Sequence, residues 1–263
     1  MKKIILTVAG ALVLASCATN PVTGRKSLSL VSNADLFPTA YNQYSQILKQ
    51  GKVITGTADA KMVQTVGERL KYAAEKYYQE KGISSQLQGY QWQFTLLNAN
   101  EVNAWCMPGG KVAVYSGILP VTKDATGLAV VLGHEIGHAL AGHSAEQASQ
   151  QMAAQGLGQI VGGSIGNAEY AKVFEQLYPV GAQVGLLNYS RKMELDADVT
   201  GLYLMAMAGY DPSQAIPFWE RMAAKSGNAG VSEFLSTHPS DATRMAKIKE
   251  ALPTALALSL IHI

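Results

Sequence analysis

The sequence reads Val131-Leu-Gly-His134-Glu135-Ile-Gly-His138-Ala-Leu140 in its middle. On a helix, positions i and i+4 lie on one face, one turn apart. His134 and His138 can therefore reach one Zn²⁺ ion, with Glu135 beside them as a general base. Apolar residues flank both histidines, as expected for a helix packed into a core. The stretch predicts a zinc-binding helix with apolar flanks.

Zinc in a catalytic site takes three protein ligands and keeps a fourth position open for water. His143 follows the motif, but at 100° per residue it would lie about 140° around the helix from His138. We therefore expect His143 to face away from the metal, at the surface or in a second layer. The histidine extension of the metzincin pattern is absent, so the third ligand is expected elsewhere in the chain.

A second helix offers the missing ligand. It is expected within Asn188-Tyr-Ser-Arg-Lys-Met-Glu194-Leu-Asp-Ala-Asp198-Val-Thr-Gly201, where Glu194 and Asp198 share one face. An acid at the first of these positions could bind zinc, and one at the second could accept a hydrogen bond from a ligand imidazole. Asp196 would point elsewhere, which makes it the weaker candidate. We predict Glu194 as the third ligand.

The periodicity of the rest of the chain predicts a mostly helical α+β fold. Residues 91–97 alternate between apolar and polar, which is typical of a strand. Residues 102–107 and 111–116 are also strand-like, and Pro108-Gly-Gly110 between them predicts a hairpin. The sheet is therefore expected to be small and partly antiparallel. Helices are expected at about 35–49, 59–81, 125–143, 145–160, 169–187, 190–208, 213–226 and 241–250.

Signals at the N-terminus predict export and a lipid anchor. Lys2-Lys3 precede an apolar run that is shorter than the roughly 20 residues a membrane span needs, which favours a signal peptide. The run ends in Leu14-Ala-Ser-Cys17, which resembles the lipobox of bacterial lipoproteins. We expect residues 1–16 to be a lipoprotein signal peptide, Cys17 to carry the lipid, and residues 17–33 to form a tether. A secretory signal peptide with an incidental cysteine is the alternative.

The two ends of the chain also bound the expected domain. Ala18 stands where an Asp would favour inner-membrane retention in enteric bacteria, so the outer membrane is the expected location. The last six residues, 258–263, can be encoded by a common sequencing adapter, and we predict that they are an artefact. A real apolar tail is the alternative, and His262 is excluded from the site in both cases. The predicted metallopeptidase domain is therefore 34–257.

Composition and charge exclude several classes of protein. The chain is 48% hydrophobic and 15% charged, which is ordinary for a globular domain. Lys2 and Lys3 supply the whole formal net charge of +2, and no basic stripe remains, so nucleic acid is not an expected partner. The two cysteines, Cys17 and Cys106, cannot form a disulfide framework.

His134-Glu135-x-x-His138 with Glu194-x-x-Ala197-Asp198 resembles the gluzincin metallopeptidases of the CAAX prenyl protease and HtpX-like family. The resemblance runs in order over about residues 60–250. The multiple membrane helices of the CAAX and HtpX branches are missing, so the chain resembles the soluble lipoprotein branch of periplasmic endopeptidases. Three further stretches match the family, and a fourth, near the mature start, fits that branch: Asn103-Ala-Trp-Cys-Met-Pro-Gly-Gly-Lys-Val-Ala-Val-Tyr-Ser-Gly117, Ser190-Arg191, Thr237-His238-Pro239 followed by Arg244, and Asn20-Pro-Val-Thr-Gly-Arg25.

The resemblance implies a zincin-like fold with one Zn²⁺ per chain. The ion would be held by His134, His138 and Glu194. Glu135 would take the proton of the attacking water and pass it to the leaving amine. Asp198 would accept a hydrogen bond from a ligand histidine.

Further residues acquire implied roles around the metal. His238 would stabilise the oxyanion of the tetrahedral intermediate, and Arg244 would orient or assist it. A plain loop histidine and a surface arginine are the respective alternatives. An extended substrate would pair with the strand that starts at Asn103 and Ala104. Cys106 on this strand is expected to be a buried free thiol, with an inhibitory zinc thiolate as the alternative.

The resemblance implies a zinc-dependent endopeptidase of the bacterial periplasm. It would be anchored by lipid to the outer membrane and would degrade unfolded or misassembled envelope proteins. A zinc-stabilised chaperone or assembly factor with latent or weak proteolysis is the alternative, in which the Gly- and Gln-rich segment 145–168 could be a lid. A zinc hydrolase of another amide is a third possibility.

Overall fold

The computed structural model describes residues 17–154, 167–177, 189–225, 227, 229–239 and 241–261. The predicted signal peptide, His262 and residues 155–166 of the suggested lid lie outside these ranges. Within them, no helix is both long and apolar enough to cross a membrane.

The predicted mostly helical α+β fold with a small, partly antiparallel sheet is confirmed. Short 3₁₀ helices join several of the main elements. The strands and α-helices are β1 Cys17–Thr19, β2 Lys26–Leu28, α2 Phe37–Gln50, β3 Val53–Ile54, α3 Ala58–Glu80, β4 Gln93–Leu97, β5 Ala104–Met107, β6 Lys111–Tyr115, α4 Leu119–Thr122, α5 Ala125–Leu140, α6 His143–Ala154, α7 Asn167–Leu177, α8 Arg191–Met207, α9 Ala215–Ala224, α10 Ala229–Thr237 and α11 Ala242–Ile261.

The larger sheet has four strands in the order β3-β4-β6-β5. β4 and β6 run parallel, whereas the pairs β3–β4 and β5–β6 are antiparallel. The predicted hairpin joins β5 to β6, and Gly109 and Gly110 both adopt φ +83 in its turn, a conformation that favours glycine. β5 is therefore an edge strand of this sheet among the described residues.

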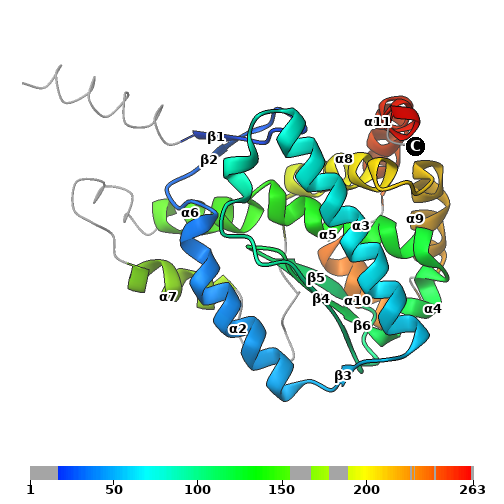
Figure 1. Cartoon of the computed structure of the whole chain (residues 1–263), viewed down its shortest axis with the longest axis horizontal. Coiled ribbons are helices and arrows are strands. Elements are labelled where there is room, and N and C mark those ends of the chain that lie inside the picture. Colours follow the sequence, from blue (N-terminus) through cyan, green and yellow to red (C-terminus); the bar gives the residue numbers. More distant parts are fainter. Residues whose placement is uncertain are drawn as a thin grey trace, which may run out of the picture.

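Both faces of the sheet are covered by helices. Side chains alternate from face to face along each strand, so β4, β5 and β6 each contribute to two cores. Phe94, Cys106 and Val112 point to one face and pack in a core with α3, α5 and α8. Trp105 and Ala113 point to the other face and pack with α2, α6 and α7. Figure 1 shows the sheet between α2 and α3. The predicted metal-binding helix α5 thus lies inside the larger core.

The backbones of α5 and α8 approach very closely, and glycines make this possible. A Cβ atom built on Gly133 would lie 2.8 Å from the carbonyl oxygen of Gly201. One built on Gly201 would lie 2.5 Å from the carbonyl carbon of Gly133. A side chain at either position would force the helices apart, so this contact fixes how near α8 can bring its side chains to α5.

Several helix boundaries differ from the prediction. α5 ends at Leu140, not at 143, because Gly142 adopts φ +67 and the chain turns before α6. α10 lies where no helix is predicted, and α11 continues to Ile261 rather than ending at 250. The described part of the predicted artefact, 258–261, is therefore helical, and its origin stays a prediction.

The segment predicted as a tether packs on the domain. β1 and β2 form an antiparallel pair, and Asn20 in the turn between them is buried. Backbone N–H groups of Leu30 and Val31 both donate to the hydroxyl of Ser149 on α6, at 2.9 and 3.0 Å. Residues 20–33 are thus part of the folded body rather than a free linker.

Candidate active site

α5 carries both predicted histidine ligands. The helix starts at Ala125 because the Asp124 side chain caps it, accepting a hydrogen bond from the backbone N–H of Gly127 at 2.8 Å. All residues from 127 to 140 are buried, as expected for a helix that is apolar on every side. The Nε2 atoms of His134 and His138, one turn apart, lie 3.0 Å from each other.

α8 brings a carboxylate to the same point. Ser190 caps this helix by accepting a hydrogen bond from the backbone N–H of Met193, and Glu194 lies in its first turn. The Oε2 atom of Glu194 is 3.4 Å from Nε2 of His134, and its Oε1 atom is 3.3 Å from Nε2 of His138. The structure therefore gathers the three predicted ligands into one cluster.

His238 joins this cluster from the end of α10. It is 2% exposed, and its Nδ1 atom lies 3.2 Å from both Nε2 of His134 and Oε2 of Glu194. Ligand atoms of His134, His138, Glu194 and His238 all lie within 4.8 Å of one another. His238 is thus a site residue rather than a histidine of a remote loop, and its role as oxyanion stabiliser stays a prediction.

The geometry of the cluster fits zinc. Tetrahedral Zn–N bonds of 2.0–2.1 Å place ligand atoms about 3.3 Å apart. The three separations measured among His134, His138 and Glu194 range from 3.0 to 3.4 Å. The Oε1 atoms of Glu135 and Glu194 are buried and have no hydrogen-bond partner among the described residues. The Glu194 oxygen faces Nε2 of His138 at 3.3 Å without a hydrogen bond to it, and a metal ion would be a partner for both atoms.

The charges of the cluster also favour a cation. Glu135, Glu194 and Asp198 are buried carboxylates, and Arg244 is the buried guanidinium among them. With a metal ion bound and the imidazoles therefore neutral, these groups carry a net charge of −2, which one divalent ion would balance. The same charged groups shift the pKa of His134 when no metal ion is bound. Burial and the charge of Arg244 lower it, but Asp198 and Glu194 outweigh both and raise it to about 9.

Asp198 and Arg244 both contact His134 at its Nδ1 atom. The Nδ1 atom of His134 lies 2.8 Å from Oδ1 of Asp198, and Nη2 of Arg244 donates to the same oxygen at 2.6 Å. Arg244 is fully buried, with its guanidinium carbon 3.4 Å from the centre of the Trp219 ring. Its Nη1 donates to the carbonyl oxygen of His238 at 3.1 Å. The surface position considered for Arg244 is therefore wrong, and its contacts orient Asp198 and His238.

Glu135 lies beside the cluster and is buried. It is 4% exposed, and its Oε1 atom is 3.6 Å from Nε2 of His238. Burial raises the pKa of Glu135, which suits a group that exchanges a proton near neutral pH. Burial, together with the charge of Glu135, also raises the pKa of the Cys106 thiol well above its usual value. Because zinc binds the thiolate, this environment favours Cys106 as a buried free thiol.

Asn103 and Ala104 lie where the edge strand β5 begins. The backbone N–H of Ala104 donates to Oδ1 of Asn103 at 2.8 Å, and the carbonyl oxygen of Asn103 accepts from the backbone N–H of Tyr115 at 3.0 Å. β5 packs directly on α5. The strand is therefore beside the metal helix, and its pairing with substrate stays a prediction.

The structure places His143 in a second layer behind His138, which is one of the two places predicted for it, and not at the surface. α5 ends before it, so the angle of 100° per residue does not apply, and the fully buried ring turns back until its Nδ1 atom is 2.8 Å from Nδ1 of His138. Asp196 points away from the cluster, as predicted, and lies 3.0 Å from Nε2 of His143. Sequence reasoning missed Tyr189, whose ring stacks on His138 with centroids 4.0 Å apart. Its place just before α8 is the only hint that the sequence gives.

Residues 64–252 match the family model described as "Peptidase family M48". This chain belongs to that family. Membership of family M48 agrees with the metallopeptidase class expected from the sequence, and it leaves the narrower CAAX and HtpX-like branch undecided.

Relatives of this M48 chain carry names of two kinds. It is 42% identical over 165 residues to the mitochondrial metalloendopeptidase OMA1 of Schizosaccharomyces pombe, covering 62% of this chain and 48% of that protein. Against the mitochondrial metalloendopeptidase OMA1 of Homo sapiens the identity is 30% over 247 residues, covering 91% and 46%. Against the beta-barrel assembly-enhancing protease of Yersinia pestis it is 32% over 179 residues, covering 62% and 36%. The chain spans half or less of the length of each.

Proposed function

We propose that this chain is a zinc-dependent endopeptidase that hydrolyses peptide bonds of unfolded or misassembled proteins of the bacterial envelope. The observation that carries the proposal is the buried cluster of His134, His138 and Glu194 with Glu135 beside it. Membership of family M48 supports the reaction class, as do relatives named metalloendopeptidase and protease.

The residues of the cluster would have two roles in hydrolysis, metal binding and proton transfer. A zinc ion held by His134, His138 and Glu194 would polarise the scissile carbonyl and lower the pKa of the attacking water. Glu135 would accept the proton of the attacking water and carry it to the leaving amine. Its buried position and raised pKa suit both steps.

His238 would act on the oxygen of the scissile carbonyl. Its Nε2 atom faces Glu135 at 3.6 Å, whereas Nδ1 faces the metal cluster, so Nε2 would be the nitrogen that reaches the substrate. Arg244 would hold this histidine through its backbone carbonyl rather than touch the substrate. An extended peptide would lie along β5 near Asn103 and Ala104 and bind through backbone hydrogen bonds, so its sequence would matter little.

The envelope location rests on the N-terminal sequence. The predicted signal peptide and the lipobox at Cys17 support a periplasmic lipoprotein anchored to the outer membrane, and thus the soluble lipoprotein branch of the family. The name of the Yersinia pestis relative supports a bacterial assembly task. Other relatives are named mitochondrial, so this part of the proposal is supported by the predicted signal peptide rather than by similarity to these relatives. Nucleic acid is not a proposed partner.

A second candidate function is a zinc-stabilised chaperone or assembly factor with weak or latent proteolysis. Burial of the site favours it, because Glu135 and His238 are only 4% and 2% exposed. A substrate could reach them only after the site opens. The word assembly in the name of the Yersinia pestis relative points the same way.

One experiment separates the candidates. The chain from residue 18 onward, wild type and Glu135→Gln, is analysed for zinc by mass spectrometry and incubated with unfolded casein. The endopeptidase predicts one zinc per chain in both proteins, with cleavage by the wild type alone that a chelator blocks. Zinc without cleavage in either protein supports the assembly factor. A wild-type protein that binds no zinc contradicts both.

A further inference from the structure

His138 reaches a carboxylate through the ring of another histidine. Its Nδ1 atom is 2.8 Å from Nδ1 of His143, whose Nε2 atom is 3.0 Å from Oδ2 of Asp196. An ionised carboxylate only accepts hydrogen bonds, so Nε2 of His143 carries a proton and its Nδ1 is the acceptor. His138 then donates from Nδ1 and keeps the lone pair of Nε2 for the metal. The chain of contacts therefore selects the tautomer that a zinc ligand needs.

Asp196 is held in turn by a tight turn of the N-terminal segment, Asn20–Arg25. The turn is closed by its own backbone, since the N–H of Asn20 donates to the carbonyl oxygen of Arg25 at 2.8 Å. Three of its side chains then converge on Asp196. Asn20 donates to Oδ2 at 3.0 Å, Arg25 donates to the same oxygen through Nε at 2.7 Å, and the Thr23 hydroxyl donates to Oδ1.

Arg25 also fastens the helix that begins with His143. Its Nη1 and Nη2 atoms donate to the two carboxylate oxygens of Glu146 on α6, at 3.1 and 2.6 Å. One guanidinium thus joins α6 to Asp196 on α8, and His143, the first residue of α6, points its ring at the same Asp196. A shift of the turn would move Asp196, which holds the His143 ring, and would release α6 from Arg25.

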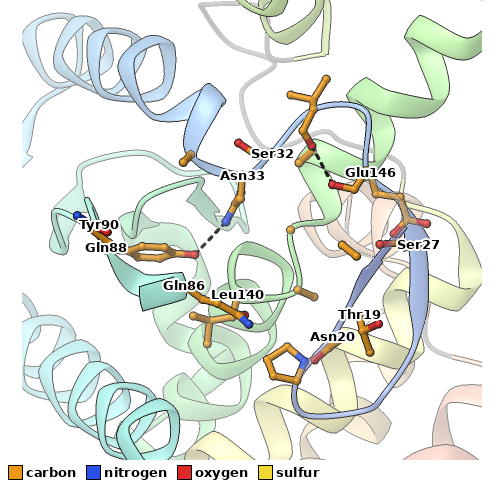
Figure 2. Close-up of a pocket in the computed structure, with 18 of the residues that line it drawn as sticks. Thr19, Asn20, Ser27, Ser32, Asn33, Gln86, Gln88, Tyr90, Leu140 and Glu146 are labelled. Carbon is orange, nitrogen blue, oxygen red and sulfur yellow. Dashed lines mark hydrogen bonds between the residues drawn. The ribbon is translucent and has the colours of Figure 1, made fainter. Parts of the chain in front are cut away.

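The turn attaches the β1–β2 hairpin to the body beside a cavity of about 590 Å³. Figure 2 shows this cavity between the hairpin and the loop that carries Tyr90. Its lining includes Thr19, Asn20 and Ser27 on the hairpin side, and Gln88, Tyr90 and Leu140 on the side of the body. Asn20 and Glu146, which take part in the contacts of the turn, both line this cavity.

The two histidine ligands are supported in parallel ways. His134 contacts Asp198 directly, and Asp198 pairs with Arg244 at 2.6 Å. His138 contacts a carboxylate two positions earlier on α8 through His143, and that carboxylate pairs with Arg25 at 2.7 Å. Each ligand thus has a carboxylate of α8 and a buried or half-buried arginine behind it.

We propose that His143 and Asp196 are positioning residues that orient His138 for zinc, and that the turn Asn20–Arg25 is a working part of the metal centre. A clamp that merely tied α6 to α8 would need no ring nitrogen aimed at His138. The inference rests on zinc binding by this site and not on peptide cleavage. Protein that binds zinc without cleaving casein would contradict the proposed endopeptidase and leave this inference standing.

The test measures zinc affinity on the full mature chain, by competition with a chromophoric chelator. Loss of such an outer partner lowers metal affinity about 10- to 100-fold, and His143→Leu is expected to do so. His143→Gln retains a donor and an acceptor and should recover part of the loss. Arg25→Gln should weaken zinc binding by about threefold, because it acts through Asp196. The matched control is Lys26→Ala, which removes an exposed charge from the same hairpin and should leave the affinity unchanged.

Two further readouts separate positioning from plain stability. The visible spectrum of the cobalt-substituted protein should change in His143→Leu and in Arg25→Gln but not in Lys26→Ala, because it reports the ligand geometry. Thermal unfolding of the metal-free proteins measures the structural cost alone. A zinc affinity of His143→Leu within twofold of wild type overturns the proposal. So does an equal loss in His143→Leu and His143→Gln that follows the stability of the metal-free proteins.

Discussion

Gly137 of α5 lies directly against the carbonyl oxygen of Ala197 in α8, so closely that a Cβ atom on Gly137 would lie 2.8 Å from that oxygen. This position is between the motif residues, one before His138, and Ala197 is three residues after Glu194. The ligands of the two helices can meet because nothing larger than hydrogen separates the backbones here.

Gly137→Ala is expected to push the two helices apart and draw Glu194 away from the histidines. Overpacking of this kind costs about 1–3 kcal/mol of unfolding free energy, and zinc affinity should fall with it. Thermal unfolding and zinc titration measure the two effects. Gly227→Ala is the control, because a Cβ there meets nothing within 4 Å. An unchanged zinc affinity in Gly137→Ala would show that the helix contact does not set the ligand geometry.

Glu194→Ala should lower the zinc content well below one ion per chain, because it removes one of the three protein ligands. Zinc is measured by mass spectrometry after equilibration with a weak chelator. Glu220→Ala, on α9, provides a control for loss of a carboxylate. A full complement of zinc in Glu194→Ala would mean that another residue, with His238 the nearest candidate, completes the site.

Arg244→Met should destabilise the protein strongly, because it leaves Asp198 as a buried charge without its cation. Breaking such a pair costs about 3–5 kcal/mol, which chemical denaturation can measure. Lys247→Ala, which removes an exposed charge from the same helix, should change the stability by far less. A small loss in Arg244→Met would argue that water reaches Asp198 in solution.

Removal of zinc should lower the thermal stability of the whole domain. The stabilisation by bound ligand, about 2.7 kcal/mol at 100 times Kd, is then lost. The buried carboxylates also lose the ion that balances them, and a proton on His134, whose pKa is raised to about 9, balances only part of their charge. For a domain of this size we expect the Tm to fall by about 5–10 °C. Differential scanning calorimetry with and without chelator measures it, and restored zinc should restore the Tm. Equal Tm values in the two states would place the metal outside the folded core.

Cys17→Ala should abolish incorporation of labelled palmitate and release the protein from the membrane fraction of a bacterial host. The reason is that the lipobox cysteine is the only proposed attachment point for lipid. Cys106→Ala is the matched control, because it removes the other, buried cysteine. Continued labelling of Cys17→Ala would contradict the lipoprotein prediction.

The parts of the site that are local in sequence could be predicted, and those that depend on a turn or on distant packing could not. His134, Glu135 and His138 follow from helical spacing alone, and Glu194 with Asp198 follows from the same rule on a second helix. The direct contact of His143 with His138 could not be predicted, because Gly142 breaks the helix two residues after Leu140 and a helical projection cannot anticipate this.

The partners of Asp196 could not be predicted from the sequence either. Asn20 and Arg25 lie more than 170 residues before it in the chain, and no spacing rule connects such positions. The sheet was predicted in part for a related reason. Alternation reveals β4, whereas the two residues of β3 are too few to show a period.

The position of Arg244 sets the order in which the site can be completed. A chain made from its N-terminus contains His134 and His138 more than a hundred residues before the guanidinium that fixes Asp198 behind His134. Until α11 docks, Asp198 and the carbonyl of His238 have no cation to hold them. We therefore expect full zinc affinity only after α11 has docked, so that an incompletely folded chain would lack the complete metal site.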